Sequence, residues 1–329
     1  MSRICGVYGM GNPLMDVICR VDHRALDALG YAPGSMNLVD HAQQEAILAV
    51  CAQTKLLAGG SCANTVRAIA FLAASDDRKP TYTGGVGSDD TGRAFGALLE
   101  AEGVRSRLGF KETPTGRSVI LVTPDGQRTM FTYLGACREM TAQDVDVELL
   151  READIFHTTG YMWDTDGQEA AAQWAMTEAK ESGATVSFDI ADPFVVARFR
   201  DKLIDWLPGH TDLLFANAEE LSALVGIDGP EERVVGEAFA FAPTVIMKVG
   251  ERGAYLGADG RITLIPGTPV DAQDTTGAGD SFAGGYLYGI AQGLDRESSV
   301  DLANAIASRV VTVDGCDYDR LMRSTIVGN

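Results

Sequence analysis

A glycine-rich segment near the end of the chain, residues 274–285 (DTTGAGDSFAGG), has the composition of an anion-binding turn. Gly277, Ala278 and Gly279 precede an apolar stretch that predicts a helix, so their N–H groups would lie at the positive end of the helix dipole. Such a turn is an anion hole that needs no side chain. Asp280 follows in the first turn, where it could take a proton from a hydroxyl attacking a bound phosphoryl group. Alternatively, Asp280 only stabilises the helix, by about 0.3–1 kcal/mol.

A second glycine pair, Gly59-Gly60, precedes another predicted helix at residues 61–74. Paired glycines let the chain turn sharply and let a ligand approach main-chain amides closely. Asn64, in the first turn, would then offer its amide to a hydroxyl-rich ligand. The alternative is a structural role only, with Ser61 capping the helix.

The start of the chain carries Asn12 and Asp16 in the run GMGNPLMD. They follow a predicted strand, and ligands of open α/β sheets bind at the carboxyl ends of the strands. A surface Asx-turn pair is the alternative. Gly9 and Gly11 imitate a dinucleotide fingerprint, but Leu14 holds its third glycine position, which argues against a dehydrogenase. The chain has no Gly-Lys dipeptide, which excludes a P-loop.

Alternating apolar runs and amphipathic stretches predict the elements that position these residues. Strands are expected at 3–9, 81–86, 154–159, 184–189, 212–216 and 244–249, and helices at 61–74, 91–102, 167–182, 193–206, 218–225, 278–292 and 298–313. This alternation is typical of a doubly wound α/β fold, with a mostly parallel sheet covered by helices on both faces.

Residues 118–133 (SVILVTPDGQRTMFTY) interrupt the alternation and predict a hairpin that turns at Asp125-Gly126. We expect it to pair with residues near 14–21 or 34–40 in a small separate sheet that forms a lid over the site. The alternative is an antiparallel edge of the main sheet.

The composition narrows the class of protein. The 329 residues suggest one large domain, with 46% hydrophobic and 22% charged residues. A net charge of −19 without any basic run argues against nucleic-acid or membrane partners. Six cysteines without a C-x-x-C pair and four histidines without ligand spacing argue against structural zinc. No signal peptide and no apolar run of membrane length is apparent, so we predict a cytoplasmic protein.

The segments GGSCANTVRAIAFL near residue 60 and DTTGAGDSFAGGYLYGI near residue 280 resemble the two signature motifs of the ribokinase-like (PfkB) family of carbohydrate and nucleoside kinases. Their order and separation fit that family, and the resemblance spans essentially the whole chain. It implies a single ribokinase-like kinase domain over residues 1–329, with a β-sheet lid formed by segments about 13–40 and 108–137. It also implies ATP as the phosphate donor, with Mg²⁺ and K⁺.

The resemblance assigns roles to individual residues. Asp280 resembles the catalytic base of the family, and residues 277–279 resemble its anion hole. The residues expected to hold the acceptor are Asn12, Asp16, Gly60, Asn64 and Arg128. The residues expected to contact ATP are Asn217, Lys248, Gly250 and Gly253. Without the resemblance, the last two glycines would mark an ordinary turn.

Three of these roles have open alternatives. Glu220 matches the end of the family's N-x-x-E motif, which organises water-bound Mg²⁺, but Asn217 and Glu220 also fit a helix capping box. Arg128 resembles an arginine that reaches the transferred phosphate when the lid closes, or is simply an exposed hairpin residue. Asp274 matches a position beside the K⁺ site, whose backbone ligands would come partly from residues 311–315.

The acceptor is suggested by two segments, GMGNPLMD and PGSMNLVD, which resemble the adenosine-kinase branch of the family. Met36 and Leu38 would contact a purine, with Phe131 or Tyr133 nearby, or would be lid core only. The leading hypothesis is phosphorylation of the 5′-hydroxyl of a nucleoside, most simply adenosine. The alternatives are a ribokinase- or fructokinase-type sugar kinase and a catalytically silent sugar- or nucleoside-binding regulator. A monomer and a homodimer are both compatible with a lid sheet.

Overall fold

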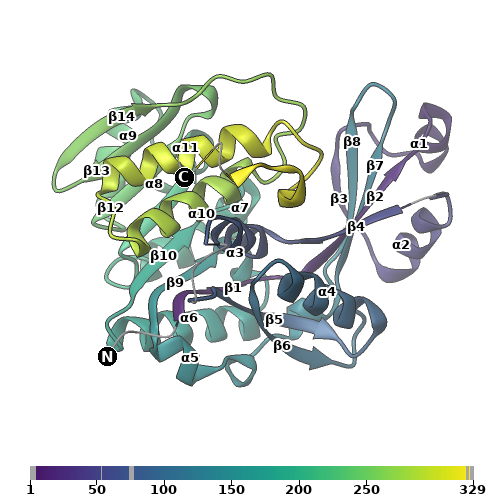
Figure 1. The fold of residues 1–329 in the computed structure, drawn as a ribbon, viewed down its shortest axis with the longest axis horizontal. Helices are drawn as coiled ribbons and strands as arrows, with labels where there is room; N and C mark the ends of the chain where they lie inside the picture. Colours follow the sequence, from purple (N-terminus) through teal and green to yellow (C-terminus); the bar gives the residue numbers. More distant parts are fainter. Residues whose placement is uncertain (1–4, 53, 74–77, 324–325, 327–329) are drawn as a thin grey trace.

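The main sheet has nine strands in the order β14-β13-β12-β11-β10-β9-β1-β5-β6 (Figure 1). The computed structural model describes residues 5–52, 54–73, 78–323 and 326. The strands from β12 to β6 run parallel, and β13 and β14 form an antiparallel edge. The strands are β1 Cys5–Met10, β5 Thr81–Gly87, β6 Arg105–Lys111, β9 Ala153–Thr159, β10 Thr185–Asp189, β11 Leu213–Asn217, β12 Thr244–Lys248, β13 Gly253–Ala258 and β14 Arg261–Pro266.

Strand β1 lies at the point where the order of the sheet reverses. The chain continues from β1 to β5 and β6 on one side, and later from β9 to β12 on the other. A crevice opens at the carboxyl ends of the strands at such a switch point, and ligands of doubly wound sheets bind there. The predicted doubly wound, mostly parallel fold is therefore confirmed, and it directs attention to the loop after β1.

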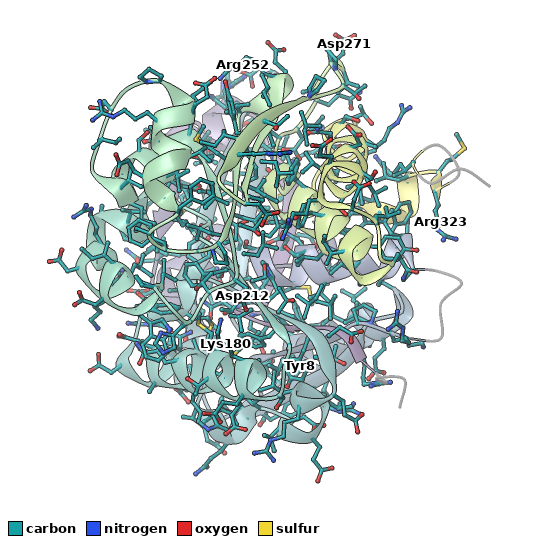
Figure 2. All side chains as sticks on the ribbon, turned by 90° about the vertical axis from the view of Figure 1, so that its left-hand side faces the viewer. Tyr8, Lys180, Asp212, Arg252, Asp271 and Arg323 are labelled. Carbon is teal, nitrogen blue, oxygen red and sulfur yellow. The ribbon has the colours of Figure 1, made fainter. Side chains whose placement is uncertain are left out.

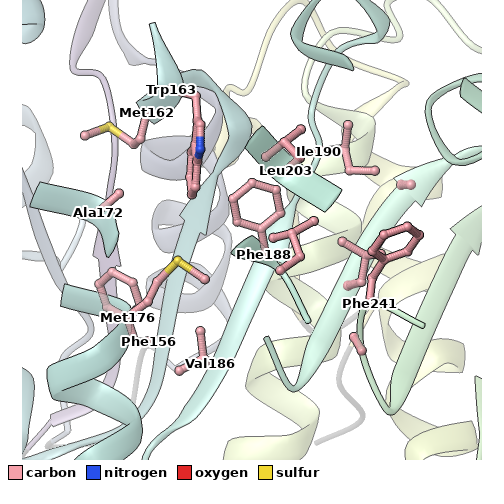
Figure 3. Packing of buried hydrophobic residues seen from close by; sticks show 14 of the residues in the cluster. Phe156, Met162, Trp163, Ala172, Met176, Val186, Phe188, Ile190, Leu203 and Phe241 are labelled. Carbon is pink, nitrogen blue, oxygen red and sulfur yellow. The ribbon is translucent and has the colours of Figure 1, made fainter. Parts of the chain in front are cut away.

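Helices cover both faces of this sheet because its central strands are apolar on both sides. Leu213 and Phe215 of β11 pack with α3, α10 and α11, whereas Leu214 and Ala216 pack with α6, α7, α8 and α9 on the opposite face. Figure 3 shows part of the core on the face covered by α6 to α9. There the rings of Trp163 and Phe188 meet edge-on, with 5.2 Å between their centroids. The helices are α1 His23–Leu29, α2 His41–Leu48, α3 Ser61–Leu72, α4 Asp90–Ala101, α5 Val147–Arg151, α6 Asp166–Glu181, α7 Pro193–Trp206, α8 Ala218–Val225, α9 Glu231–Ala238, α10 Ala278–Ala291 and α11 Arg296–Val310.

A second, five-stranded sheet stands beside the main one in the order β3-β8-β7-β2-β4 (Figure 1). Its strands are β2 Leu14–Arg20, β3 Met36–Leu38, β4 Thr54–Gly59, β7 Arg117–Val122 and β8 Arg128–Tyr133. Strands β7 and β8 form the predicted hairpin, and they pair with β2 and β3 respectively. The alternative of an antiparallel edge on the main sheet is therefore wrong. Strand β4 was not predicted, and β6, which overlaps the start of the segment 108–137, belongs to the main sheet.

The alternation of side chains gives the small sheet two different faces. Met15, Val17 and Cys19 of β2 are buried in a core that includes Leu26 of α1 and Ile47 of α2. Asp16, between them, points to the opposite face and lines a cavity. One strand therefore anchors the sheet and also presents a carboxylate to the cavity.

The predicted elements of the main domain are found within a few residues of their expected bounds. Residues 3–4 of the first predicted strand, and residue 74 of the predicted helix 61–74, lie outside the described residues. The helix predicted at 298–313 begins earlier, at Arg296, and ends at Val310. The elements absent from the prediction include α1, α2, α5, α9, β6, β13 and β14, which are mostly short or near the edges of the sheets.

Charged side chains project from the surface on all visible sides in Figure 2. Lys180 and Asp212, labelled there, form an ion pair of 2.6 Å between Nζ and Oδ1. Among the described residues, no helix has the length and apolar character needed to cross a membrane.

Candidate active site

A cavity of about 860 Å³ lies between the small sheet and the carboxyl ends of the main strands. Most residues singled out in the sequence line it, although they come from both ends of the chain. The predicted residues on its wall are Asn12, Asp16, Gly60, Asn64, Asn217, Glu220, Lys248, Gly250, Gly253, Gly277, Ala278, Gly279 and Asp280. Arg128 and Asp274 are not among the lining residues and contact each other instead.

The turn before α10 is open toward the cavity. Gly277 adopts a positive φ of 71°, and a Cβ atom there would collide with Cys316 Sγ, so the turn requires glycine. Within the described chain no side chain caps the first turn of α10. The N–H of Ala278, predicted to belong to the anion hole, instead donates a hydrogen bond within the turn, to the Thr275 carbonyl oxygen at 3.2 Å. Lys248 Nζ approaches Gly279, so a cation reinforces the helix dipole here.

Asp280 is held by side chains of another helix and does not cap its own. Its Oδ1 accepts a hydrogen bond from Ser61 Oγ at 2.7 Å, and its Oδ2 accepts one from Asn64 Nδ2 at 3.0 Å. Burial raises the pKa of Asp280 above its ordinary value, and these two hydrogen bonds oppose that rise. The result is a partly buried carboxylate on the cavity wall, held in one orientation, that can accept a proton.

The helix that supplies these two donors begins at a glycine whose backbone conformation other residues rarely adopt. Gly60 is the N-cap of α3 with a φ of 97°, and a Cβ atom there would collide with the Asn12 carbonyl oxygen. The prediction that Ser61 caps α3 is therefore wrong, because Ser61 is the first helical residue and its hydroxyl binds Asp280. Gly60 lets the first turn of α3 approach the loop after β1.

Asp16 and Asn12 lie on the acceptor side of Asp280. Burial raises the pKa of Asp16 to about 7, against the opposing charges of Arg67 and Arg128. Asn12 Oδ1 accepts from Gln168 Nε2 at 2.7 Å, and Asn12 Nδ2 donates to the Tyr161 carbonyl oxygen at 3.4 Å. Both residues line the cavity, so the surface Asx-turn alternative is wrong. Asp16 thus offers a carboxylate to the cavity, whereas the amide of Asn12 is bonded to Gln168 and Tyr161.

Asn217 and Glu220 form the capping box of α8. Glu220 accepts hydrogen bonds of 2.7 Å from both the backbone N–H and the Nδ2 of Asn217. Burial raises the pKa of Glu220 to about 7, and Lys248 opposes this. Lys248 Nζ donates to Asp189 Oδ2 at 2.8 Å. The capping box and a role in binding are thus compatible, because Glu220 also lies on the cavity wall.

This wall fits Mg²⁺ only through intervening water. The described residues contain no group of three or more His, Cys, Asp or Glu side chains able to hold a metal directly. Mg²⁺ commonly keeps several waters and is bound by one or two carboxylates together with phosphate oxygens. Glu220 and Asp189, which flank Lys248 on the wall, fit that arrangement.

Asp274, predicted to lie beside a K⁺ site, has partners within the protein. Its carboxylate accepts hydrogen bonds from the N–H groups of Thr276, at 3.0 Å, and Gly315, at 2.5 Å. It also forms an ion pair with Arg128 of the small sheet. A cation bound at this carboxylate would share it with the Arg128 guanidinium, and K⁺ binding beside Asp274 stays a prediction. Only 14% of the Arg128 side chain is exposed, so the alternative of an exposed hairpin arginine is wrong too.

The part of the cavity where ATP binding is predicted is lined by the turn between β12 and β13 and by α11. Gly250 and Gly253 bound a short 3₁₀ turn between β12 and β13, with φ values of 64° and 100°. They face Ala307 and Val311 across the same cavity. Glycines and apolar side chains thus share this part of the cavity wall.

The acceptor end is apolar. Met36 and Leu38 of β3 are about half exposed and line the cavity, so the alternative that they are only lid core is wrong. Phe131, expected nearby, is buried on the other face of the small sheet against Tyr31, and Tyr133 is not among the lining residues. The apolar side chains at this end are Leu14, Met36, Leu38, Ile120, Met130, Leu134 and Phe194.

Several lining residues were not predicted from the sequence. Asp189 ends β10 as Asp16 follows β1, so the strand-edge argument applied to Asn12 would have found it. Tyr161, Phe194 and Arg198 follow strands β9 and β10, but an aromatic or arginine after a strand carries no specific signal. Ser61 was expected to cap its own helix, whereas its hydroxyl donates to Asp280.

Comparisons with known proteins point to carbohydrate and nucleoside kinases. Residues 26–321 match the pfkB family carbohydrate kinase profile. The adenosine kinase of Saccharomyces cerevisiae is 27% identical, over 94% of this chain and 95% of its own. The ATP-dependent ribose-1-phosphate kinase of Halopiger xanaduensis is 33% identical, over 78% and 81% respectively. The crystal structure of a probable sugar kinase from Rhizobium etli CFN 42 superposes with a TM-score of 0.86 at 31% identity, covering 96% of this chain and 95% of that one.

We expect Asp16 to titrate near neutral pH. Because burial raises its pKa to about 7, the side chain is protonated below that pH and charged above it. Carboxyl NMR with ¹³C-labelled aspartate would measure the midpoint, and Asp16→Asn would assign the signal. Asp125, whose pKa a hydrogen bond from Thr123 holds below its ordinary value, provides an exposed control in the same spectrum. A midpoint for Asp16 near the ordinary 3.8 would contradict the prediction.

Proposed function

The chain belongs to the pfkB family of carbohydrate kinases, which transfer phosphate to an alcohol group, and from this premise we propose that its acceptor is a nucleoside, adenosine in the first place. The observation that carries the proposal is the apolar acceptor end of the cavity. A free sugar presents hydroxyls on every side, and it would leave Met36, Leu38 and Met130 facing polar groups. A nucleobase would cover these side chains and bury their apolar surface.

The polar side of the acceptor site suits a ribose. Asp16, when charged, can accept hydrogen bonds from the 2′- and 3′-hydroxyls. Asp280 lies beyond it, next to the anion-binding turn, where a 5′-hydroxyl would be directed. The nucleoside would therefore lie with its base under β3 and β8 and its 5′ end at the start of α10.

The reaction uses Asp280 as the base. The 5′-oxygen attacks the γ-phosphorus of ATP, its proton passes to the Asp280 carboxylate as the new O–P bond forms, and the bond to ADP breaks. The N–H groups of Gly277 and Gly279 and the Lys248 ammonium lie where they can stabilise charge on the transferred phosphoryl group. Mg²⁺, when bound, would neutralise phosphate charge, held through water by Glu220.

Two alternative functions are distinguished from adenosine phosphorylation by the tests below. A sugar or sugar-phosphate kinase is favoured by the ribose-1-phosphate kinase relative and by Arg198, a cation on the cavity wall. A silent binding protein is disfavoured by the two hydrogen bonds that orient Asp280 toward the cavity, since binding alone needs no oriented base.

Adenosine should be phosphorylated with a kcat/KM at least about tenfold above ribose or fructose, which corresponds to roughly 1.4 kcal/mol from contacts with the base. A coupled ADP-release assay over a panel of nucleosides, sugars and ribose 1-phosphate measures this ratio. Leu38→Ser should reduce the advantage of adenosine and leave ribose turnover unchanged. Leu294→Ser, which changes a similarly exposed leucine outside the cavity wall, is the matched control. Equal or better turnover of a sugar or sugar phosphate would refute adenosine as the acceptor.

Asp280→Asn should lower kcat at least about a hundredfold, because it removes the group that accepts the proton. Asparagine keeps the volume, and Asp280 does not cap α10, so the melting temperature should stay close to that of the parent. Asp166→Asn, which changes a first-turn carboxylate of α6, is the matched control and should leave kcat unchanged. A nearly normal kcat with a lowered melting temperature would instead assign Asp280 a structural role.

Glu220→Gln should raise the Mg²⁺ concentration required for half-maximal activity about tenfold, as is typical when an outer-shell metal partner is changed. Glutamine can still complete a capping box, so α8 should remain folded. The rate measured against free Mg²⁺ at fixed ATP tests this. Gln43→Ala, in the capping box of α2, serves as a control for capping alone. An unchanged Mg²⁺ response, or activity that resists a chelator, would contradict the role of Glu220.

A further inference from the structure

Arg67 is buried behind the cavity and uses its entire guanidinium. Only 1% of the residue is exposed, and it lies three positions after Asn64 on α3. Its Nε and Nη2 donate to the Glu102 carboxylate, and Nη2 also donates to the Cys316 carbonyl oxygen at 2.9 Å. Its Nη1 donates to the Ala58 carbonyl oxygen of β4 and to Asn64 Oδ1, the latter at 3.2 Å. These five contacts match the five N–H donors that arginine possesses.

The contact with Asn64 decides which way that amide points. Arg67 has only donors, so it binds the amide oxygen and directs Nδ2 of Asn64 toward Asp280, at 3.0 Å. In the flipped orientation the amide oxygen would face the Asp280 carboxylate, and the NH₂ group would face the guanidinium. Both contacts would be repulsive, so the flipped orientation is excluded while Arg67 is present.

A second contact fixes the backbone at the same position. Tyr318 Oη donates to the Asn64 carbonyl oxygen at 3.1 Å and lies 2.8 Å from Ser281 Oγ, next to Asp280. The Arg67 guanidinium lies over the Tyr318 ring, 5.3 Å from its centroid. Arg67 thus supports Asn64 directly and through this tyrosine.

We propose that Arg67 is a positioning residue for the phosphoryl transfer, which orients Asp280 through Asn64 and links the base to β4 of the small sheet and to the loop at Cys316. Ion pairing with Glu102 alone would need two of the five donors. The other three reach three separate segments that meet at the site, as expected of a residue that sets the relative position of those segments. The inference rests on the proposed function for its kinetic consequence, but not for its geometry.

A double-mutant cycle tests the proposal. Arg67→Lys keeps the charge but leaves too few donors, and we expect kcat to fall at least about tenfold, because small misplacements of a catalytic group are costly. The acceptor KM should change much less. Asn64→Ala should lower kcat similarly, and adding Arg67→Lys to it should lower kcat by clearly less than Arg67→Lys does in the parent. Arg151→Lys, in a two-bond ion pair with Glu178 away from the cavity, should leave kcat unchanged. Additive losses from Arg67→Lys and Asn64→Ala, or an unchanged kcat in Arg67→Lys, would overturn the proposal.

A second variant covers the case in which Arg67→Lys does not fold. Replacing both partners, as Arg67→Met with Glu102→Met, removes the ion pair without leaving a buried charge unpaired, a change that proteins often tolerate. It should lower kcat as Arg67→Lys does. A folded double variant with the kcat of the parent would overturn the proposal.

A readout without turnover separates this inference from the proposed function. Loss of the hydrogen bond from Asn64 should raise the pKa of Asp280 in Arg67→Lys, measured by carboxyl NMR with ¹³C-labelled aspartate. The other charged groups facing Asp280, namely Asp16, Asp189 and Lys248, are retained in that variant. A parent that is inactive on the whole acceptor panel would refute the proposed function alone. An unchanged titration of Asp280 would refute the positioning role, whatever the activity.

Discussion

The partial burial of the Asp280 carboxylate is the constraint on which the rest of the site depends. A buried carboxylate is stable only with hydrogen-bond donors around it, and these come from Ser61 and Asn64 at the start of another helix. Two helix N-termini therefore have to meet, which requires a close approach of backbone on both sides. Gly284 of α10 provides it, since a Cβ atom there would collide with Ala68 and with the Thr65 carbonyl oxygen of α3. The anion hole and the base are thus consequences of one packing arrangement between α3 and α10.

The small sheet follows from a second constraint, that a strand exposes alternate side chains to opposite faces. One face is buried against α1 and α2, so the other must carry whatever the cavity requires. On β2 this is Asp16, and on β3 the apolar pair Met36 and Leu38. The small sheet therefore supplies Asp16 and the apolar pair to the cavity, while Asp280 belongs to the main domain. The Arg128–Asp274 ion pair crosses the same gap and holds the two parts together.

The sequence predicted what is encoded locally. Apolar periodicity located the central strands and helices, Asp125-Gly126 located the hairpin, and the glycine motifs located the two helix starts that meet at the site. Strand β4 was not predicted because its sequence has no clear apolar pattern. Four of its six residues are not buried, and Lys55 interrupts the apolar run. Asn64 was assigned to the ligand, whereas its amide lies between Arg67 and Asp280. That pairing, like the ion pair of Asp274 with Arg128, joins segments distant in the sequence, and spacing along the chain carries no signal for it.

The charges around the cavity explain how an acidic protein can take a polyanionic donor. The chain has a net charge of −19, and Asp16, Asp189, Glu220 and Asp280 all lie on the cavity wall. Counted as four full negative charges, they would repel a triphosphate strongly. Burial instead raises the pKa of Asp16 and of Glu220 to about 7, so near neutral pH each carries only part of a charge. Lys248 donates to Asp189 next to the turn that would hold the phosphates, where α10 adds the positive end of its dipole. Burial thus raises the pKa of Asp280 and, by raising the pKa of Asp16 and Glu220, also lowers the negative charge that a triphosphate would meet in the cavity.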